Sequence, residues 1–261
     1  NFASWRWWSP LLKNTPQGHR VYAPDLRGCG DTDQPFDGYS IDQHMTDLAD
    51  LIQALHLPRL HLVGHSLGGC IALEYALANS DRIKTLTLVA PAPAEGRSVL
   101  KSVDNGNGLA TTSDAIYKAL RLSDRLGTTR VALERALAKL LPTDRITFNF
   151  DALVDDAVRM SHHAVAGHIQ TLKTWDVRDN LNTLNRPVLI IGGTNDPLVD
   201  PKALEAVSRM LPKSRLIIWP GAGHTPQLEN PQRFTRIWTK FAAQNNTLKI
   251  CHRFNRRQKM V

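Results

Sequence analysis

One serine lies in a setting that is typical of an activated nucleophile. The segment Gly64-His65-Ser66-Leu67-Gly68 fits the Gly-x-Ser-x-Gly pattern, between a predicted strand and a predicted helix. Small residues two places before and two places after the serine would leave room for a sharp turn. The hydroxyl would then stand clear of the strand end, close to a helix N-terminus that favours developing negative charge. We therefore predict that Ser66 is a nucleophile.

A serine hydroxyl needs a base to take its proton, and the base needs an acid to orient it. His224 lies just beyond the last predicted strand, and Asp196 lies between a strand and a helix. We predict them as general base and orienting acid. His65 is nearer in sequence, but a residue that flanks the serine points away from its hydroxyl, so we interpret it as a packing residue. Asp200 is an alternative acid, although its place before Pro201 is typical of a helix N-cap.

The elements that must position these residues alternate along the chain. Short apolar runs predict strands at residues 19–24, 59–63, 83–89, 187–191 and 215–219. Helical patterns follow at residues 40–57, 70–78, 201–211 and 231–241. Ser40 and Gln43 form a capping-box pattern at the start of the first of these helices. Strands that alternate with helices predict a mostly parallel sheet covered on both faces, which is the α/β class.

A long helical stretch interrupts this alternation. Its helical patterns are residues 114–122, 130–140, 151–160 and 165–174, with no convincing buried strand among them. We predict a core at residues 1–92 and 185–245 and an inserted helical cap at 93–184. The cap would open with a flexible loop at residues 95–113, rich in Gly, Asn and Ser. Residues 246–261 are predicted to form a basic, solvated tail.

Together these motifs resemble the α/β-hydrolase superfamily. The resemblance rests on Ala23-Pro-Asp-Leu-Arg-Gly-Cys-Gly30, the nucleophile elbow Gly64-His65-Ser66-Leu67-Gly68, Pro187-Val-Leu-Ile-Ile-Gly-Gly193 with Asp196, Gly223-His224, and the chain order of the three site residues. It implies an acyl-enzyme at Ser66, hydrolysed by water that His224 activates. The related haloalkane dehalogenases and epoxide hydrolases place an aspartate at the elbow, so Ser66 argues against both.

The resemblance also bears on the start of the chain. Members of this superfamily usually begin with two or three further strands and a His-Gly motif, and residues 1–8 resemble the segment directly after that motif. We therefore expect a fragment that lacks its first strands. The oxyanion hole implied by the resemblance consists of the backbone amides of Leu67 and of Asn1 (or Phe2).

Composition and charge limit the kinds of partner that we expect for this protein. The 261 residues carry a net charge of +8. Five of the basic side chains lie after residue 248, where there is no acidic residue, so much of this charge belongs to the tail. The charge therefore does not indicate a nucleic-acid partner. No apolar run approaches the ~20 residues of a membrane span. Three cysteines without Cys-x-x-Cys spacing indicate neither a disulfide framework nor a zinc site. We expect a cytoplasmic enzyme with a small-molecule substrate and neither metal nor cofactor.

Residues beside the predicted site would select the substrate, namely Leu67, Leu198, Val199 and Thr225. Four large side chains could line the inner face of the cap: Phe148, Phe150, Met160 and Trp175. Core packing within the cap is the simpler interpretation for each of them. Three cap histidines show neither an acid partner nor metal-ligand spacing, and we interpret them as solvated: His162, His163 and His168.

The pattern predicts hydrolysis of a carboxylic ester or lactone through an acyl-enzyme at Ser66. A carbon–carbon bond hydrolase acting on a diketone would use the same triad, and a cofactor-free perhydrolase is a further alternative. Some members of the superfamily keep the triad but act as ligand-sensing receptors. Hydrolytic turnover and ligand-dependent partner binding would separate these hypotheses.

Overall fold

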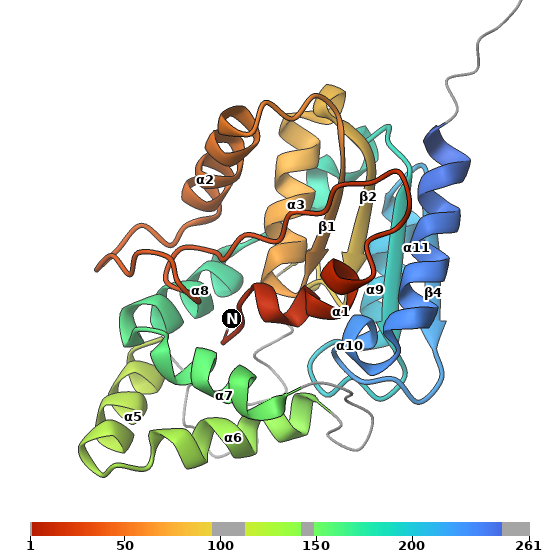
Figure 1. Cartoon of the computed structure of the whole chain (residues 1–261). Coiled ribbons are helices and arrows are strands. Elements are labelled where there is room, and N and C mark those ends of the chain that lie inside the picture. Colours follow the sequence, from red (N-terminus) through yellow and green to blue (C-terminus); the bar gives the residue numbers. More distant parts are fainter. Residues whose placement is uncertain (1, 96–112, 142–148, 247–261) are drawn as a thin grey trace, which may run out of the picture.

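The described residues build a parallel sheet of four strands (Figure 1). The computed structural model describes residues 2–95, 113–141 and 149–246. The strands are hydrogen-bonded in the order β1 (Leu60–His65), β2 (Ile83–Val89), β3 (Val188–Gly193) and β4 (Ser214–Trp219), and every neighbouring pair is parallel. Four of the five predicted strands are thus confirmed to within two residues. Because the strands are parallel, their carboxyl ends meet at one edge of the sheet.

Helices cover both faces of this sheet, as the α/β class requires. On one face lie α2 (Ile41–Ala54), α3 (Leu67–Ala78) and α9 (Pro201–Met210). On the other face α11 (Pro231–Asn246) packs together with α1 (Ser9–Lys13). The described chain also contains four short helices: the 3₁₀ helices η1 (Trp5–Trp8), η2 (Ser80–Arg82) and η3 (Arg178–Thr183), and the α-helix α10 (Pro226–Glu229).

Strand β3 shows how the sequence fills both layers. Val188 and Ile190 belong to the buried cluster under α3 and α9, whereas Leu189 and Ile191 belong to the cluster under α11. Successive side chains of a strand point to opposite faces, so a continuous apolar run is needed wherever both faces are covered. All four of these side chains are at most 1% exposed.

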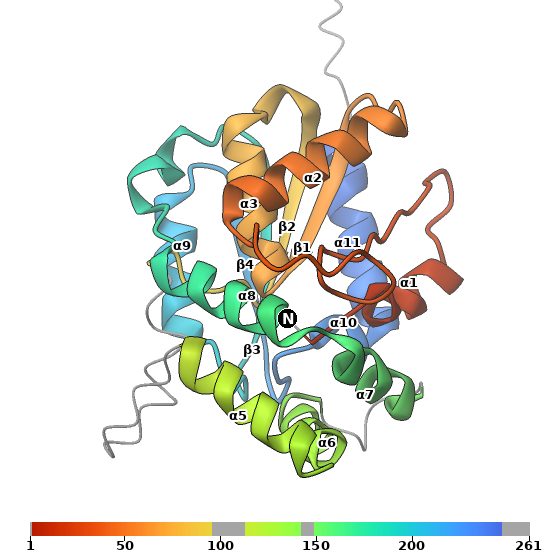
Figure 2. The ribbon, with the colours of Figure 1, turned by 90° about the vertical axis from the view of Figure 1, so that its left-hand side faces the viewer.

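Among the described residues between β2 and β3, four longer helices occur. They are α5 (Ser113–Arg125), α6 (Thr129–Leu140), α7 (Phe150–Arg159) and α8 (His162–Thr174), close to the predicted bounds. Figures 1 and 2 both show α5, α6 and α7 beyond the same end of the sheet. Their apolar residues form a separate buried cluster with residues of other elements: Trp7, Leu133, Leu137, Leu141, Leu153, Val154, Ala157 and Leu228. The division into core and cap at residues 93–184 stays a prediction.

The strand predicted at residues 19–24 is wrong. This segment has no regular secondary structure and pairs with no strand of the described chain. Side-chain contacts hold it instead: the ring of His19 lies 5.1 Å from that of Trp238 and 5.8 Å from that of His61, measured between centroids. An apolar pattern predicts extended backbone, but only a hydrogen-bonded neighbour makes it a strand.

A buried carboxylate ties the start of the described chain to α7. Asp156 is 2% exposed, and it accepts hydrogen bonds from the Ser4 hydroxyl, from Arg6 Nη1 at 2.7 Å and from Arg159 Nη2 at 2.5 Å. Burial alone would raise the pKa of Asp156, but the hydrogen bonds from Ser4, Arg159 and Arg6 together outweigh it and lower this pKa. The segment before α1 is therefore fixed by charge as well as by packing.

Several predictions fall on residues that the structure does not describe. They concern Asn1, Phe148, most of the loop at residues 95–113 and, beyond Asn246, the basic tail. In the described part of the chain, no helix has both the length and the apolar character needed to cross a membrane.

Candidate active site

Ser66 occupies the sharp turn that its motif predicts. It stands between β1 and α3 with φ +52° and ψ −120°, in the left-handed region that residues other than glycine rarely adopt. Such a conformation costs about 1–3 kcal/mol and persists only where the surroundings enforce it. The Ser66 amide donates to the carbonyl of Val89 at 3.0 Å, which fixes the turn to the end of β2.

The glycines around the serine differ in what they do. A Cβ at Gly64 would lie 2.2 Å from the backbone oxygen of Gly68 and 2.8 Å from Cα of Gly69, so only glycine fits there. A Cβ at Gly68 would meet nothing within 4 Å. The steric reason predicted for both glycines thus applies to Gly64 and is wrong for Gly68.

Asp196 and His224 form a buried pair. Asp196 Oδ2 lies 2.9 Å from His224 Nδ1, and the two side chains are 1% and 4% exposed. Asp196 Oδ1 accepts the amides of Leu198 at 2.8 Å and Val199 at 3.0 Å. A carboxylate only accepts, so the histidine carries its proton on Nδ1 and leaves the Nε2 lone pair free to act as a base.

Asp200, the alternative acid, has another role. Its side chain accepts the amide of Lys202 at 2.8 Å and caps the N-terminus of α9. The structure thus pairs His224 with Asp196, and the N-cap interpretation of Asp200 is confirmed.

The loop that carries His224 is held by contacts that the sequence analysis missed. Glu229 accepts the amide of Gly223 at 3.0 Å with each carboxylate oxygen and the amide of Thr225 at 3.2 Å. Its carboxylate therefore binds the amides on both sides of His224. The spacing of six and four residues from Glu229 back to these amides was a visible signal, because a carboxylate in a short helix can cap the turn before it.

The end of β3 supports this loop from the other side. A Cβ at Gly193 would lie 2.1 Å from the carbonyl oxygen of Ala222 and 2.5 Å from that of Gly223. The amide of Asn195 donates to the Ala222 carbonyl at 2.9 Å. The segments that carry Asp196 and His224 are thus in direct backbone contact.

Ser66 and His224, the predicted nucleophile and base, lie at the same edge of the sheet. His65, next to Ser66, has its Nε2 atom 2.8 Å from the backbone oxygen of His224. Among the hydrogen bonds of the described residues, none joins the Ser66 hydroxyl to His224. The predicted base and acid are therefore already paired, whereas the predicted nucleophile and base are not yet hydrogen-bonded. Catalytic hydrogen bonds often tighten only when substrate binds.

The predicted oxyanion donors differ in their positions in the structure. Leu67 is the first residue of α3, so its amide is one of the helix N–H groups without an intrahelical partner. Asn1 lies outside the described residues. The amide of Phe2 donates to Met160 Sδ at 3.4 Å, which turns this alternative donor towards the inserted helices.

Most of the predicted substrate contacts are buried. Leu67 and Thr225 are fully buried and Val199 is 2% exposed, whereas Leu198 is half-buried. The Thr225 hydroxyl donates to Glu229 at 3.3 Å. Of the four side chains, Leu198 is the one that the structure leaves partly accessible.

Large side chains of the inserted helices pack as the simpler interpretation predicts. Met160 and Trp175 are each 5% exposed, and Phe150 is partly buried against the cluster of α6 and α7. The indole N–H of Trp175 donates to Glu74 Oε1 at 2.8 Å.

The interpretation of the three histidines as solvated is wrong for His168. His168 is fully buried, 5.0 Å from the ring of His44 and 5.3 Å from that of Tyr39. His162 has the acid partner that the sequence did not reveal, because its Nε2 lies 2.8 Å from Asp124 Oδ2 of α5. Only tertiary packing brings α5 and α8 together.

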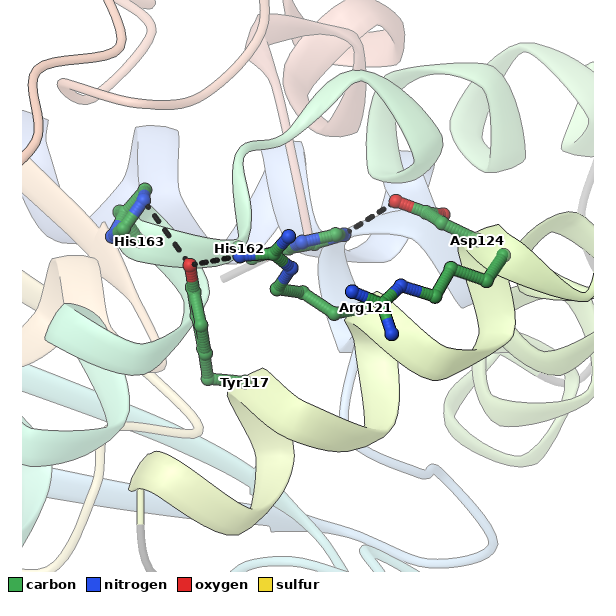
Figure 3. A pocket seen from close by; sticks show the side chains of 6 residues that line it. Tyr117, Arg121, Asp124, His162 and His163 are labelled. Carbon is green, nitrogen blue, oxygen red and sulfur yellow. Dashed lines mark hydrogen bonds and ion pairs between the residues drawn. The ribbon is translucent and has the colours of Figure 1, made fainter.

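Two cavities lie on this part of the molecule. One of about 370 Å³ opens between α5 and α8 and is lined by Tyr117, Arg121, Asp124, Arg125, His162 and His163 (Figure 3). The second, of about 870 Å³, shares Tyr117 and His163 with it and extends along residues 36–42. Neither is lined by Ser66, Asp196 or His224.

The fold identifies the protein family. The alpha/beta hydrolase fold family matches residues 1–231, and the chain belongs to this family. It is 29% identical to a putative carbamate hydrolase RutD of Pseudomonas savastanoi, over 90% of this chain and 88% of that protein. It is 32% identical to a putative non-heme chloroperoxidase of Synechocystis sp., over 84% and 79%.

Solved structures agree on the fold. An esterase from Exiguobacterium antarcticum matches with a TM-score of 0.77 and 23% identity, covering 92% of this chain and 88% of that one. A bromoperoxidase from Bacillus anthracis matches with a TM-score of 0.79 and 25% identity, with the same two coverages. The α/β-hydrolase fold predicted from the motifs is confirmed.

Proposed function

We propose that this protein is a serine hydrolase that cleaves a carboxylic ester or lactone through an acyl-enzyme at Ser66. One observation carries the proposal: a buried Asp196–His224 pair lies at the same sheet edge as a serine held at φ +52°. Hydrolases with such triads are recognised by geometry and by the role of each group. The relatives named as hydrolases and the structural neighbour named as an esterase support the same class.

The reaction then follows from the atoms available. Ser66 Oγ attacks the substrate carbonyl, and its proton passes to His224 Nε2, the nitrogen that Asp196 leaves free. The Leu67 amide, at the N-terminus of α3, would donate to the oxyanion. The alcohol leaves with the proton from His224. Water, deprotonated by the same nitrogen, then releases the acid and restores Ser66.

The test uses the full-length protein encoded by the gene, with p-nitrophenyl acetate as substrate and a fluorophosphonate as label. We expect turnover, and label on Ser66 in the peptide mass spectrum. Ser66→Ala should lose both, and His224→Ala should lower turnover by a factor on the order of 10³ or more. Folding of each variant is checked by circular dichroism. A folded protein without Ser66-dependent turnover or labelling contradicts the proposal.

A second candidate has its own observation. Two relatives are named as haloperoxidases, one from Synechocystis sp. and one from Bacillus anthracis. In a cofactor-free perhydrolase, hydrogen peroxide instead of water would attack the acyl-enzyme at Ser66 and release a peracid. Peracid formation from acetate and hydrogen peroxide measures this activity. Labelling of Ser66 without ester turnover would favour carbon–carbon bond cleavage, and ligand binding without turnover would favour a receptor.

A further inference from the structure

His65 makes contacts that a mere packing residue does not require. It is the last residue of β1, directly before the proposed nucleophile. Its ring lies between two others, with centroids 4.9 Å from His224 and 5.6 Å from Trp7. Its Nε2 lies 2.8 Å from the backbone oxygen of His224. One side chain thus contacts both the ring and the backbone of the proposed base.

The contact determines which ring nitrogen of His65 carries a proton. A carbonyl oxygen only accepts, so His65 Nε2 must carry the proton and donate it. Burial, followed by the nearby His224, holds the pKa of His65 well below its ordinary value of 6.5. The ring therefore stays neutral at neutral pH, with the donor in place and no charge that would repel a protonated His224.

The surroundings of His224 show why a donor at this point matters. His224 stands in a loop between β4 and α10, outside the regular hydrogen bonding of a strand or helix. Asp196 holds its ring, Glu229 holds the amides of its two neighbours, and His65 holds its carbonyl. Without the His65 donor, a buried carbonyl would lose its partner and the loop would lose the contact nearest to Ser66.

We propose that His65 is a positioning residue, which fixes the distance between the base and the nucleophile through its hydrogen bond to the His224 carbonyl. This inference rests on the proposed function, because it assigns His65 a role in the same proton transfer. An error of about 1 Å in such a distance can cost a factor of about 10² in rate.

Two substitutions separate the hydrogen bond from the packing. His65→Phe keeps a ring between Trp7 and His224 but removes the donor. His65→Gln keeps an N–H donor close to the place of Nε2 but removes the ring. We expect His65→Phe to lower kcat by about 10–100-fold with little change in KM. We expect His65→Gln to restore most of that loss.

A matched control comes from the same strand. His61 also lies on β1, and its Nδ1 contacts the Thr85 hydroxyl at 2.7 Å, away from the site. His61→Phe should leave kcat unchanged. The midpoint of thermal unfolding is measured for all three variants, so that a loss of folding is seen as such.

Several results would overturn the inference. They are full kcat in His65→Phe, a greater loss in His65→Gln than in His65→Phe, or an equal loss in His61→Phe. A readout independent of turnover separates this inference from the proposed function. Amide hydrogen exchange should speed up at residues 223–225 in His65→Phe and not in His65→Gln, whether or not the wild type hydrolyses esters. Unchanged exchange in His65→Phe would refute the positioning role.

Discussion

Replacing Gly193 by alanine should displace the proposed base without touching it. Gly193 ends β3, and its added methyl would lie 2.1 Å from the carbonyl oxygen of Ala222 and 2.5 Å from that of Gly223. Real Cβ atoms essentially never approach other heavy atoms within 3.0 Å. Both oxygens belong to the backbone directly before His224, so no side-chain rotation can relieve the overlap.

The size of the effect follows from these distances. To reach ordinary contact, the loop must retreat by about 1 Å, which would stretch the 2.9 Å bond between Asp196 and His224. A misplacement of about 1 Å can cost a factor of about 10² in rate, equivalent to about 2.7 kcal/mol of activation free energy. Overpacking also destabilises a fold, typically by about 1–3 kcal/mol. We therefore expect Gly193→Ala to lower kcat about 100-fold. The free energy of unfolding should fall by about 1–3 kcal/mol.

The neighbouring glycine supplies the control. A methyl at Gly192 would lie 2.2 Å from Leu204 Cδ1, the end of a flexible side chain, on the other face of the sheet. Gly192→Ala should therefore cost stability but little activity. The assay is ester turnover with urea unfolding of both variants. If Gly193→Ala kept wild-type kcat, or if Gly192→Ala lost as much, the reasoning from the loop contact would be refuted.

Three further predictions follow from the same structure. Glu229→Gln should lower kcat about tenfold in the ester assay, because one carboxylate oxygen that accepts the Gly223 amide becomes a donor; unchanged kcat would contradict this. Gly64→Ala should lose most folded protein in circular dichroism, whereas Gly68→Ala should fold normally, since a Cβ clashes with backbone at the first position and meets nothing at the second. Burial lowers the pKa of His44 from 6.5 to about 4, so the unfolded state binds its proton first as pH falls. The free energy of unfolding, measured with urea, should thus drop by up to about 3 kcal/mol as the pH falls from 6.5 to about 4. The same pH change should lower it by less in His44→Phe.

Local signals in the sequence determined the main elements. The apolar runs of β1 to β4 predicted their strands to within two residues, because a strand covered on both faces needs apolar side chains at nearly every position. Ser40 and Asp200 predicted their N-caps, because a capping side chain bonds an amide only two or three residues away. The roles of Ser66, Asp196 and His224 come from motifs in the sequence and remain a proposal.

Contacts between distant segments were decided by the tertiary structure alone. The pattern of residues 19–24 is compatible with a strand or with side-chain contacts alone, and only a neighbouring backbone selects between them. His168 reads as a polar helix residue, yet the packing of α8 against α2 buries it beside His44.

His65 shows the same limit at the proposed site. The sequence placed a histidine beside the proposed nucleophile, but it did not show that this histidine holds the loop of His224. His65 is 159 residues from the carbonyl it contacts. A residue pattern encodes which side chains are near in the chain and which face they share, whereas a bond across that separation exists only once β1 and β4 lie in one sheet.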